Sequence, residues 1–151
     1  MTKVRAARSS DLGHVIMLLL RGQRGTEYEG LLTDAAKMAE FLSGLLDNPA
    51  AQIFVLDNDG RIDGVLFGSC QEWWFGPELV GTIMMLYVEP SSRSGVFVKR
   101  MVEMFETWAA SQGAARVMLG VSSGVAVDRK DKLLKHFGYK AVGGLYAKDV
   151  G

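Results

Sequence analysis

The sequence predicts one α/β domain, of the α+β type, with a mixed central sheet. Two patterns lead to this prediction. Residues 51–70 contain two apolar, strand-forming runs on either side of Asn58, Asp59 and Gly60, which is a strong signal for a β-hairpin. Residues 79–121 follow a strand, helix, strand order of the length that favours a right-handed parallel crossover. A sheet that holds both a hairpin and a parallel crossover is mixed.

The N-terminal elements are predicted from helix caps and apolar periodicity. Residues 3–8 indicate a first strand. Ser9, Ser10 and Asp11 are candidate N-caps for the apolar segment 12–20, which predicts a helix packed on the sheet.

A loop and a second helix are predicted before the hairpin. Residues 21–30 are rich in glycine and charge without periodicity, which indicates a loop. Thr33 is a candidate N-cap for a helix over residues 34–46, and Asn48 and Pro49 end it.

The C-terminal half begins with a long amphipathic helix that Gly113 ends. A strand over residues 115–121, a short helix over 128–137 closed by Gly138, and a last strand over 139–148 follow. The apolar residues of the long helix recur every three or four positions: Val98, Met101, Val102, Phe105, Trp108 and Ala109.

Composition narrows the possible functions. The chain has 151 residues, 48% of them hydrophobic, and 17 basic residues balance 17 acidic ones, so neither a nucleic-acid nor a membrane partner is expected. No signal peptide or membrane-spanning run is recognisable, and we predict a cytoplasmic protein. One cysteine, Cys70, excludes an internal disulfide and is expected to be a buried apolar residue. With only His14 and His136 beside it, no metal site is expected.

Two segments carry a family resemblance. Residues 86–121, which begin "LYVEPSSRSG", and residues 133–146 resemble the GNAT superfamily of acyl-CoA-dependent N-acyltransferases, most closely small bacterial and phage members with a "GVSSGVA"-like segment, here residues 120–126. The resemblance implies one GNAT-like domain over residues 1–151. Its sheet would have six to seven strands, antiparallel with a splayed parallel pair, flanked by about four helices, and acetyl-CoA would be the co-substrate.

The family's diphosphate loop corresponds to the segment that begins at Arg93. Free N–H groups and the helix dipole favour an anion at such a helix start. Val96 and Val98 occupy positions that are usually small, while Lys99 and Arg100 could add charge. Backbone groups of the diverging strands, at residues 86–88 and 119–121, would bind the pantetheine. The implied coenzyme-binding residues are Leu86, Tyr87, Val88, Arg93, Ser94, Gly95, Val96, Phe97, Val98 and Lys99.

The sequence offers one candidate base and four candidate acceptor-binding residues. Glu72 lies at the end of a predicted strand beside Trp73, Trp74 and Phe75, and it is the candidate base that takes the amine's proton. The alternative is that Glu72 is an ordinary exposed loop residue and that the tryptophans cover the core or form a dimer contact. The candidates for acceptor binding are Glu27, Tyr28, Trp73 and Trp74.

Two positions depart from the family pattern. Leu134 stands where many members have the tyrosine that serves as acid, and Ala126 stands where close relatives often have asparagine. Tyr139 and Tyr146 are not assigned as its replacement.

Three readings therefore remain. The first is an N-acetyltransferase that moves the acetyl group of acetyl-CoA to a primary amine of a small molecule, peptide or protein by direct attack in a ternary complex. The second is a GNAT-fold binding or regulatory module that has lost catalysis but still holds coenzyme A. The third is an unrelated mixed α/β ligand-binding domain. A homodimer is compatible with each of them.

Overall fold

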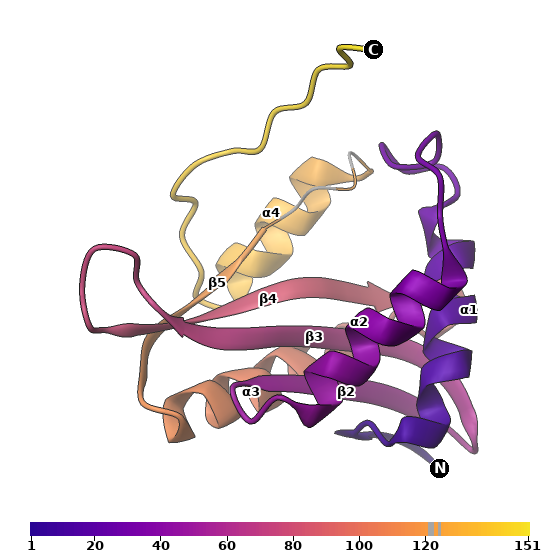
Figure 1. Cartoon of the computed structure of the whole chain (residues 1–151), viewed down its shortest axis with the longest axis horizontal. Helices are drawn as coiled ribbons and strands as arrows, with labels where there is room; N and C mark the ends of the chain where they lie inside the picture. The colour runs from indigo at the N-terminus through magenta and orange to yellow at the C-terminus, as the bar shows by residue number, and fades with distance from the viewer. Residues whose placement is uncertain (121–122, 124) are drawn as a thin grey trace.

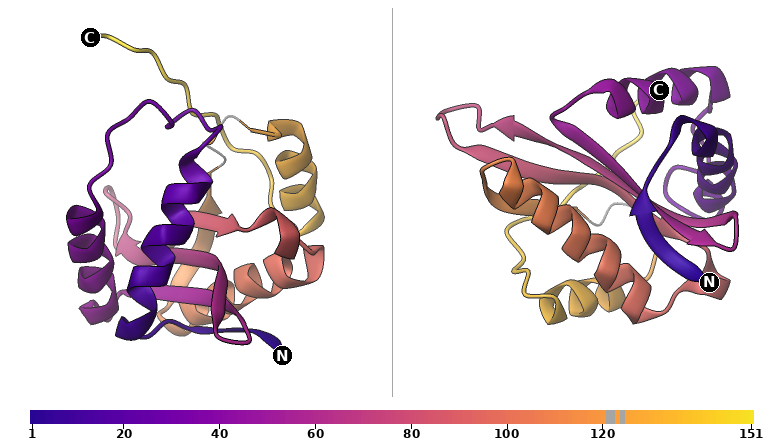
Figure 2. Two further views of the ribbon diagram at one scale, coloured as in Figure 1. Left: turned by 90° about the vertical axis from the view of Figure 1, so that its right-hand side faces the viewer. Right: turned by 90° about the horizontal axis from the view of Figure 1, so that it is seen from below.

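A computed structural model of the chain describes residues 1–120, 123 and 125–151, and it shows a single sheet with helices on both faces (Figures 1 and 2). The strands are β1 (Thr2–Ala6), β2 (Ala51–Asn58), β3 (Arg61–Glu72), β4 (Leu79–Val88) and β5 (Ala114–Leu119). The α-helices are α1 (Leu12–Gln23), α2 (Ala35–Asp47), α3 (Gly95–Ser111) and α4 (Val127–His136). Two short 3-10 turns, η1 (Ser9–Asp11) and η2 (Pro90–Ser92), precede α1 and α3.

The five strands follow the order β1-β2-β3-β4-β5 across the sheet. β1 to β4 pair antiparallel, and β5 pairs parallel with β4 after the α3 crossover, so the predicted mixed sheet is confirmed. The β2–β3 turn has φ of 51° at Asp59 and 92° at Gly60. Two successive positive φ values are what a two-residue type I′ hairpin needs, which is why the Asn-Asp-Gly sequence predicted it correctly.

The last predicted strand is wrong, and so is the expected total of six to seven strands. Residues 139–148 have no strand partner in the part of the chain that is described, and the sheet has five strands. Leu145 and Tyr146 are exposed rather than packed. Strand propensity reflects packing against a neighbouring strand and a covered face, and Gly143 and Gly144 offer no side chain for either.

The helix start predicted at Thr33 moves by one residue. Asp34 is the N-cap of α2, and its carboxylate accepts hydrogen bonds from the amides of Ala36 (2.9 Å) and Lys37 (3.1 Å). Aspartate and threonine are both good caps, and the residue whose oxygen reaches the first-turn amides fixes the boundary. The first strand similarly ends at Ala6 rather than at residue 8.

Two apolar clusters stabilise the fold, one on each face of the sheet. On the first face, α1 and α2 contribute Val15, Leu18, Leu42 and Leu45. On the other, the predicted apolar side of α3 is buried through Met101, Val102, Phe105 and Ala109. Figure 2 shows α1 and α2 on one side of the sheet and α3 and α4 on the other.

Gly68 sets how closely α3 approaches the sheet. A Cβ at Gly68 would lie 2.2 Å from the Thr82 carbonyl oxygen and 2.8 Å from the Phe105 ring. The same place carries the register shift between β3 and β4, because Phe67 pairs with Met85 but Gly68 pairs with Ile83. Met84 is thus the extra residue of a β-bulge, opposite the step from Phe67 to Gly68.

Among the described residues, no helix is both long and apolar enough for a membrane crossing. Within the same residues, no three His, Cys, Asp or Glu side chains are grouped so that they could hold a metal ion.

Replacing Gly68 with alanine should destabilise the protein by about 2–4 kcal/mol, because the methyl group has to displace backbone as well as the Phe105 ring. Urea unfolding followed by circular dichroism measures this change. The matched control is Gly44→Ala in α2, where a Cβ would meet nothing within 4 Å. It should stabilise the protein by about 0.5–1 kcal/mol through helix propensity. Equal effects of the two substitutions would contradict the role given to Gly68.

Candidate functional site

β4 and β5 separate along the sheet and leave a gap. Their pairing runs from Leu79 with Ala114 to Ile83 with Leu119. β4 then continues through residues 84–88 without β5 beside it, a length of about 15 Å. Figure 1 shows β5 rising away from β4 toward α4. The splayed parallel pair expected from the family resemblance is therefore present. Val121, expected on the β5 side, lies outside the described residues.

The backbone groups that face this gap can be identified from strand alternation. The Glu89 amide donates to the Asp63 carbonyl at 2.8 Å, so Glu89 faces β3. Because N–H and C=O groups point to alternate sides along a strand, Val88 and Leu86 face the gap. Tyr87, expected in the same group, directs its backbone toward β3 and reaches the site with its ring instead.

The N-terminus of α3 opens next to the end of β4. Ser94 is the N-cap, and its Oγ accepts from the Phe97 amide at a long 3.4 Å. The Val98 amide donates to the Ser94 carbonyl at 3.3 Å. Among the hydrogen bonds of the described residues, the amides of Gly95 and Val96 have no acceptor. The Val96 side chain is 74% exposed, so its bulk projects into solvent.

Arg93 is held in place rather than freely solvated. Its Nε donates to the Val88 carbonyl at 2.7 Å, and its guanidinium lies over the Tyr87 ring, 5.5 Å from the centroid. On α1, a Cβ at Gly22 would lie 2.7 Å from the same ring. The cation is therefore positioned between the end of β4 and the start of α3.

A buried carboxylate fixes the turn that leads into α3. Asp63 of β3 is 1% exposed and accepts hydrogen bonds from Arg61 (2.6 and 2.9 Å), Asn58 (2.9 Å) and Ser92 Oγ (2.8 Å). The Arg61 hydrogen bonds, opposed by burial, lower the pKa of Asp63 to about 2. Ser92 belongs to η2, so the hairpin holds the loop before α3. Sequence analysis missed Asp63, although a lone acid in the apolar run "IDGVLF" could have indicated it.

The remaining loop residues lie elsewhere. Phe97 and Val98 pack against the apolar cluster under α3. Lys99 pairs along the helix with Glu103 at 3.7 Å, and Arg100 lies over β2 with Phe54 and Trp108. Neither cation is held at the start of α3.

The structure does not bring Glu72, Trp73 or Trp74 to the gap. Glu72 is exposed and pairs with Leu79, at the opposite end of β4 from Val88, about 30 Å away along the strand. Trp74 is 86% exposed at the β3–β4 turn. That turn projects from the sheet in Figure 1.

Glu27 and Tyr28 lie beside the chain that leaves β5. The Glu27 amide donates to the Ser123 carbonyl at 2.8 Å, and Tyr28 follows in the same loop. Of the four acceptor-binding candidates, these two are therefore the ones near the open end of the gap.

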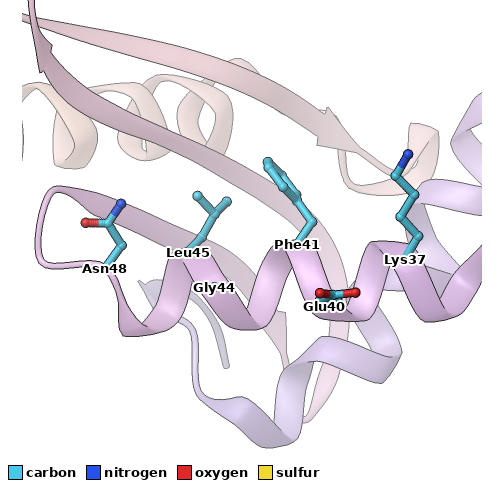
Figure 3. Close-up of a pocket in the computed structure, with 6 residues that line it drawn as sticks. All are labelled: Lys37, Glu40, Phe41, Gly44, Leu45 and Asn48. Carbon is cyan, nitrogen blue, oxygen red and sulfur yellow. The ribbon is translucent and has the colours of Figure 1, made fainter.

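A shallow hollow of about 470 Å³ lies along α2, lined by Lys37, Glu40, Phe41, Gly44, Leu45 and Asn48 (Figure 3). Phe41 and Leu45 point toward the sheet in that view, and the Phe41 ring meets Phe67 edge-on at 5.9 Å. Phe67 pairs with Met85, which is 38% exposed. The hollow thus lies on the face of the sheet that α1 and α2 cover.

No phenol replaces the missing tyrosine on α4. Leu134 is half-buried there. The Tyr139 hydroxyl donates to Glu106 at 2.7 Å, and burial, together with Glu106, raises the pKa of Tyr139. Tyr146 is 93% exposed. Ala126 precedes α4 with a left-handed φ of 49°, a conformation that asparagine adopts more readily than alanine.

Cys70 and the two histidines take no part in the site. Cys70 is buried against the α3 cluster, as predicted, and burial raises the pKa of its thiol. His14 and His136 are exposed on α1 and α4.

Comparison with known proteins connects this architecture to one family. The family model described as "Acetyltransferase (GNAT) family" matches residues 19–139. Curated protein sequences gave no match. Many solved structures share the fold, and three of them are described next.

An acetyltransferase from Trypanosoma brucei has a TM-score of 0.77 at 20% identity, over 99% of this chain and 100% of that one. Glucosamine-6-phosphate N-acetyltransferase from Arabidopsis thaliana has a TM-score of 0.77 at 16% identity, over 100% and 99%. A predicted acetyltransferase from Clostridium acetobutylicum, solved with acetyl-CoA, has a TM-score of 0.79 at 15% identity, over 99% and 96%.

Replacing Asp63 with asparagine should destabilise the protein by about 1–3 kcal/mol at neutral pH, because an amide cannot accept all the hydrogen bonds that the carboxylate accepts. The folded pKa, about 2, lies below the ordinary value of 3.8, so the carboxylate's contribution is complete above about pH 4 and is lost as the pH falls toward 2. The difference in unfolding free energy between wild type and variant should shrink over that interval in urea titrations. Asp149→Asn, in the exposed C-terminal segment, is the control, and a difference for Asp63→Asn that stays constant from pH 6 to pH 2 would contradict the assignment.

Proposed function

Because the chain belongs to the GNAT family of acetyltransferases, we propose that it is an N-acetyltransferase. It transfers the acetyl group of acetyl-CoA to a primary amine of a small molecule, peptide or protein by direct attack in a ternary complex. The observation that supports this proposal is the gap between β4 and β5, which opens onto the free amides of Gly95 and Val96.

The donor groups around the gap suit the two parts of coenzyme A. The amides of Gly95 and Val96 lie at the positive end of the α3 dipole and favour a diphosphate, and Arg93 adds a fixed charge. The backbone groups of Leu86 and the Val88 amide, on the open edge of β4, match the amides of the pantetheine arm, while the Val88 carbonyl holds Arg93. Ser94 is an N-cap, so its hydroxyl already serves the helix.

The reaction needs a neutral amine, a polarised thioester carbonyl and a tolerable leaving group. The amine nitrogen bonds to the acetyl carbon, the carbon–sulfur bond breaks, and the amine loses a proton. A thiol with an ordinary pKa of about 8.5 departs as thiolate without an obligatory acid. Because the gap closes at Ile83, the thioester would lie toward Met84, the bulged residue of β4, when the diphosphate is at α3.

The candidate base lies away from the thioester position. Glu72 stays a prediction, and its position opposite Leu79 puts it roughly 15–20 Å along β4 from Met84. It would act only through water or through an acceptor that approaches from that end. Placement of both reactants, rather than proton transfer, would then supply most of the rate.

The acceptor is proposed to approach over the α2 face of the sheet. The hollow beside Phe41 lies on that face. The loop with Glu27 and Tyr28 lies near the open end of the gap between β4 and β5. The structurally similar enzyme from Arabidopsis thaliana is a glucosamine-6-phosphate N-acetyltransferase, and small amines are therefore the first acceptors to test. Peptide and protein amines, a cytoplasmic location and a homodimer remain predictions.

A second candidate function is a binding or regulatory module that holds coenzyme A without transferring its acetyl group. One observation favours it: Leu134 replaces the acid, and the nearby Tyr139 hydroxyl is tied to Glu106.

Acetyl-CoA should bind the purified protein, giving heat in titration calorimetry and raising its melting temperature. With a panel of amino sugars, polyamines and lysine peptides, at least one amine should release free thiol from acetyl-CoA. Absence of both heat and stabilisation would overturn the proposal. Binding without thiol release would favour the module.

Replacing Leu134 with tyrosine should raise turnover on the order of 10-fold or more if proton donation to the thiolate limits the wild type. Leu134→Phe supplies the same ring without the hydroxyl and should leave turnover close to that of the wild type. Steady-state rates of thiol release compare the three proteins. Equal rates for the tyrosine and phenylalanine variants would show that the missing acid does not limit the reaction.

A further inference from the structure

Lys130 is a half-buried cation on α4. Its Nζ donates to Ser123 Oγ at 2.5 Å, and Ser123 belongs to the segment that continues from β5. Lys130 precedes Leu134 by four residues, so both lie on one face of the helix. This face includes the position at which the family's acid would meet the coenzyme.

The charges around Lys130 are unusual for a half-buried lysine. Among the described residues it makes no ion pair with a carboxylate, whereas Lys135 on the same helix pairs with Asp131 at 2.8 Å. Its ammonium is held by the segment that follows β5, whereas Arg93 is held at the end of β4. Burial, and then the charge of Arg93, lower the pKa of Lys130. Two cations without carboxylate partners, one on each side of the open end of the gap, favour an anion there.

We propose that Lys130 is the second cation of the diphosphate site, and that it binds coenzyme A from α4 while Arg93 binds it from the loop before α3. This inference rests on the proposed function. Lys99 and Arg100, which the sequence suggested for added charge, are turned along α3 and over β2. Lys130 takes that role from a different element, on the other side of the gap.

The arrangement explains how the loop tolerates its valines. Glycines at positions 96 and 98 would let backbone approach a phosphate closely. A long, flexible lysine side chain can instead reach the diphosphate from the opposite side, and its charge-assisted hydrogen bonds are stronger than those of neutral amides. Ser123 holds the ammonium at the open end of the gap until a phosphate arrives. The chain should therefore discriminate strongly in favour of thioesters that carry the diphosphate.

The test compares Lys130→Gln with Lys132→Gln, an exposed lysine on the same helix. Titration calorimetry with coenzyme A should show affinity reduced about 10- to 100-fold for Lys130→Gln and unchanged for Lys132→Gln. Pantetheine, which lacks the diphosphate, should bind both variants and the wild type equally. Lys130→Arg should restore most of the affinity for coenzyme A.

A second measurement uses the unaltered protein. Modification of lysines by acetic anhydride, mapped by mass spectrometry, should show that inorganic diphosphate and coenzyme A protect Lys130, whereas pantetheine does not. Lys132 should react equally in all samples.

Equal coenzyme A affinities in Lys130→Gln and Lys132→Gln, or no protection by diphosphate, would overturn the inference. A fall in kcat with unchanged affinity would also overturn it, since it would place Lys130 at the thioester. These results leave the proposed function intact. If the wild type itself fails to bind coenzyme A, the proposed function fails first and the inference fails with it.

Discussion

Backbone amides and carbonyls have to be hydrogen-bonded, and among the residues that the structure describes a set of them lacks internal partners at one place. The parallel pair β4 and β5 ends at Ile83 and Leu119, while β4 runs on to Val88 and α3 begins with two free amides. These groups share one opening, so an extended ligand with amides at one end and an anion at the other can satisfy them together. The site is in this sense a property of the main chain. That explains why the family can vary its side chains so widely at 15–20% identity and keep the fold.

Side chains act chiefly by fixing where those backbone groups lie. Asp63 joins the β2–β3 hairpin to Ser92, and Arg93 joins the loop to Val88 and to the Tyr87 ring. On the other side of the sheet, Gly68 lets Phe105 of α3 contact β3 at the bulge. Together, Asp63, Arg93 and Gly68 therefore fix the position of the start of α3 relative to the end of β4.

Local patterns allowed most of the fold to be predicted. The Asn-Asp-Gly turn, the apolar side of α3 and the strand, helix, strand order are encoded by neighbouring residues, and the structure confirms each. The strand expected over residues 139–148 was wrong because strand pairing depends on a partner that is distant in the chain. The same limit applies to the site. The start of α3 was recognisable from its motif, but the distance of Glu72 from the gap depends on strand register, and the contact of Lys130 with Ser123 depends on how α4 folds back.

The unpaired C-terminal segment has a consequence for how the molecule meets other molecules. Because the described residues form no sixth strand, β5 is an edge strand, with a row of backbone donors and acceptors along its free side. Arg116 is its one charged residue, and a cation on an edge strand discourages another chain from adding to it. The Arg116 guanidinium is thus the one charge on β5 that opposes edge-to-edge pairing between two copies of the protein. At high protein concentration, we expect association through this edge before any loss of core packing.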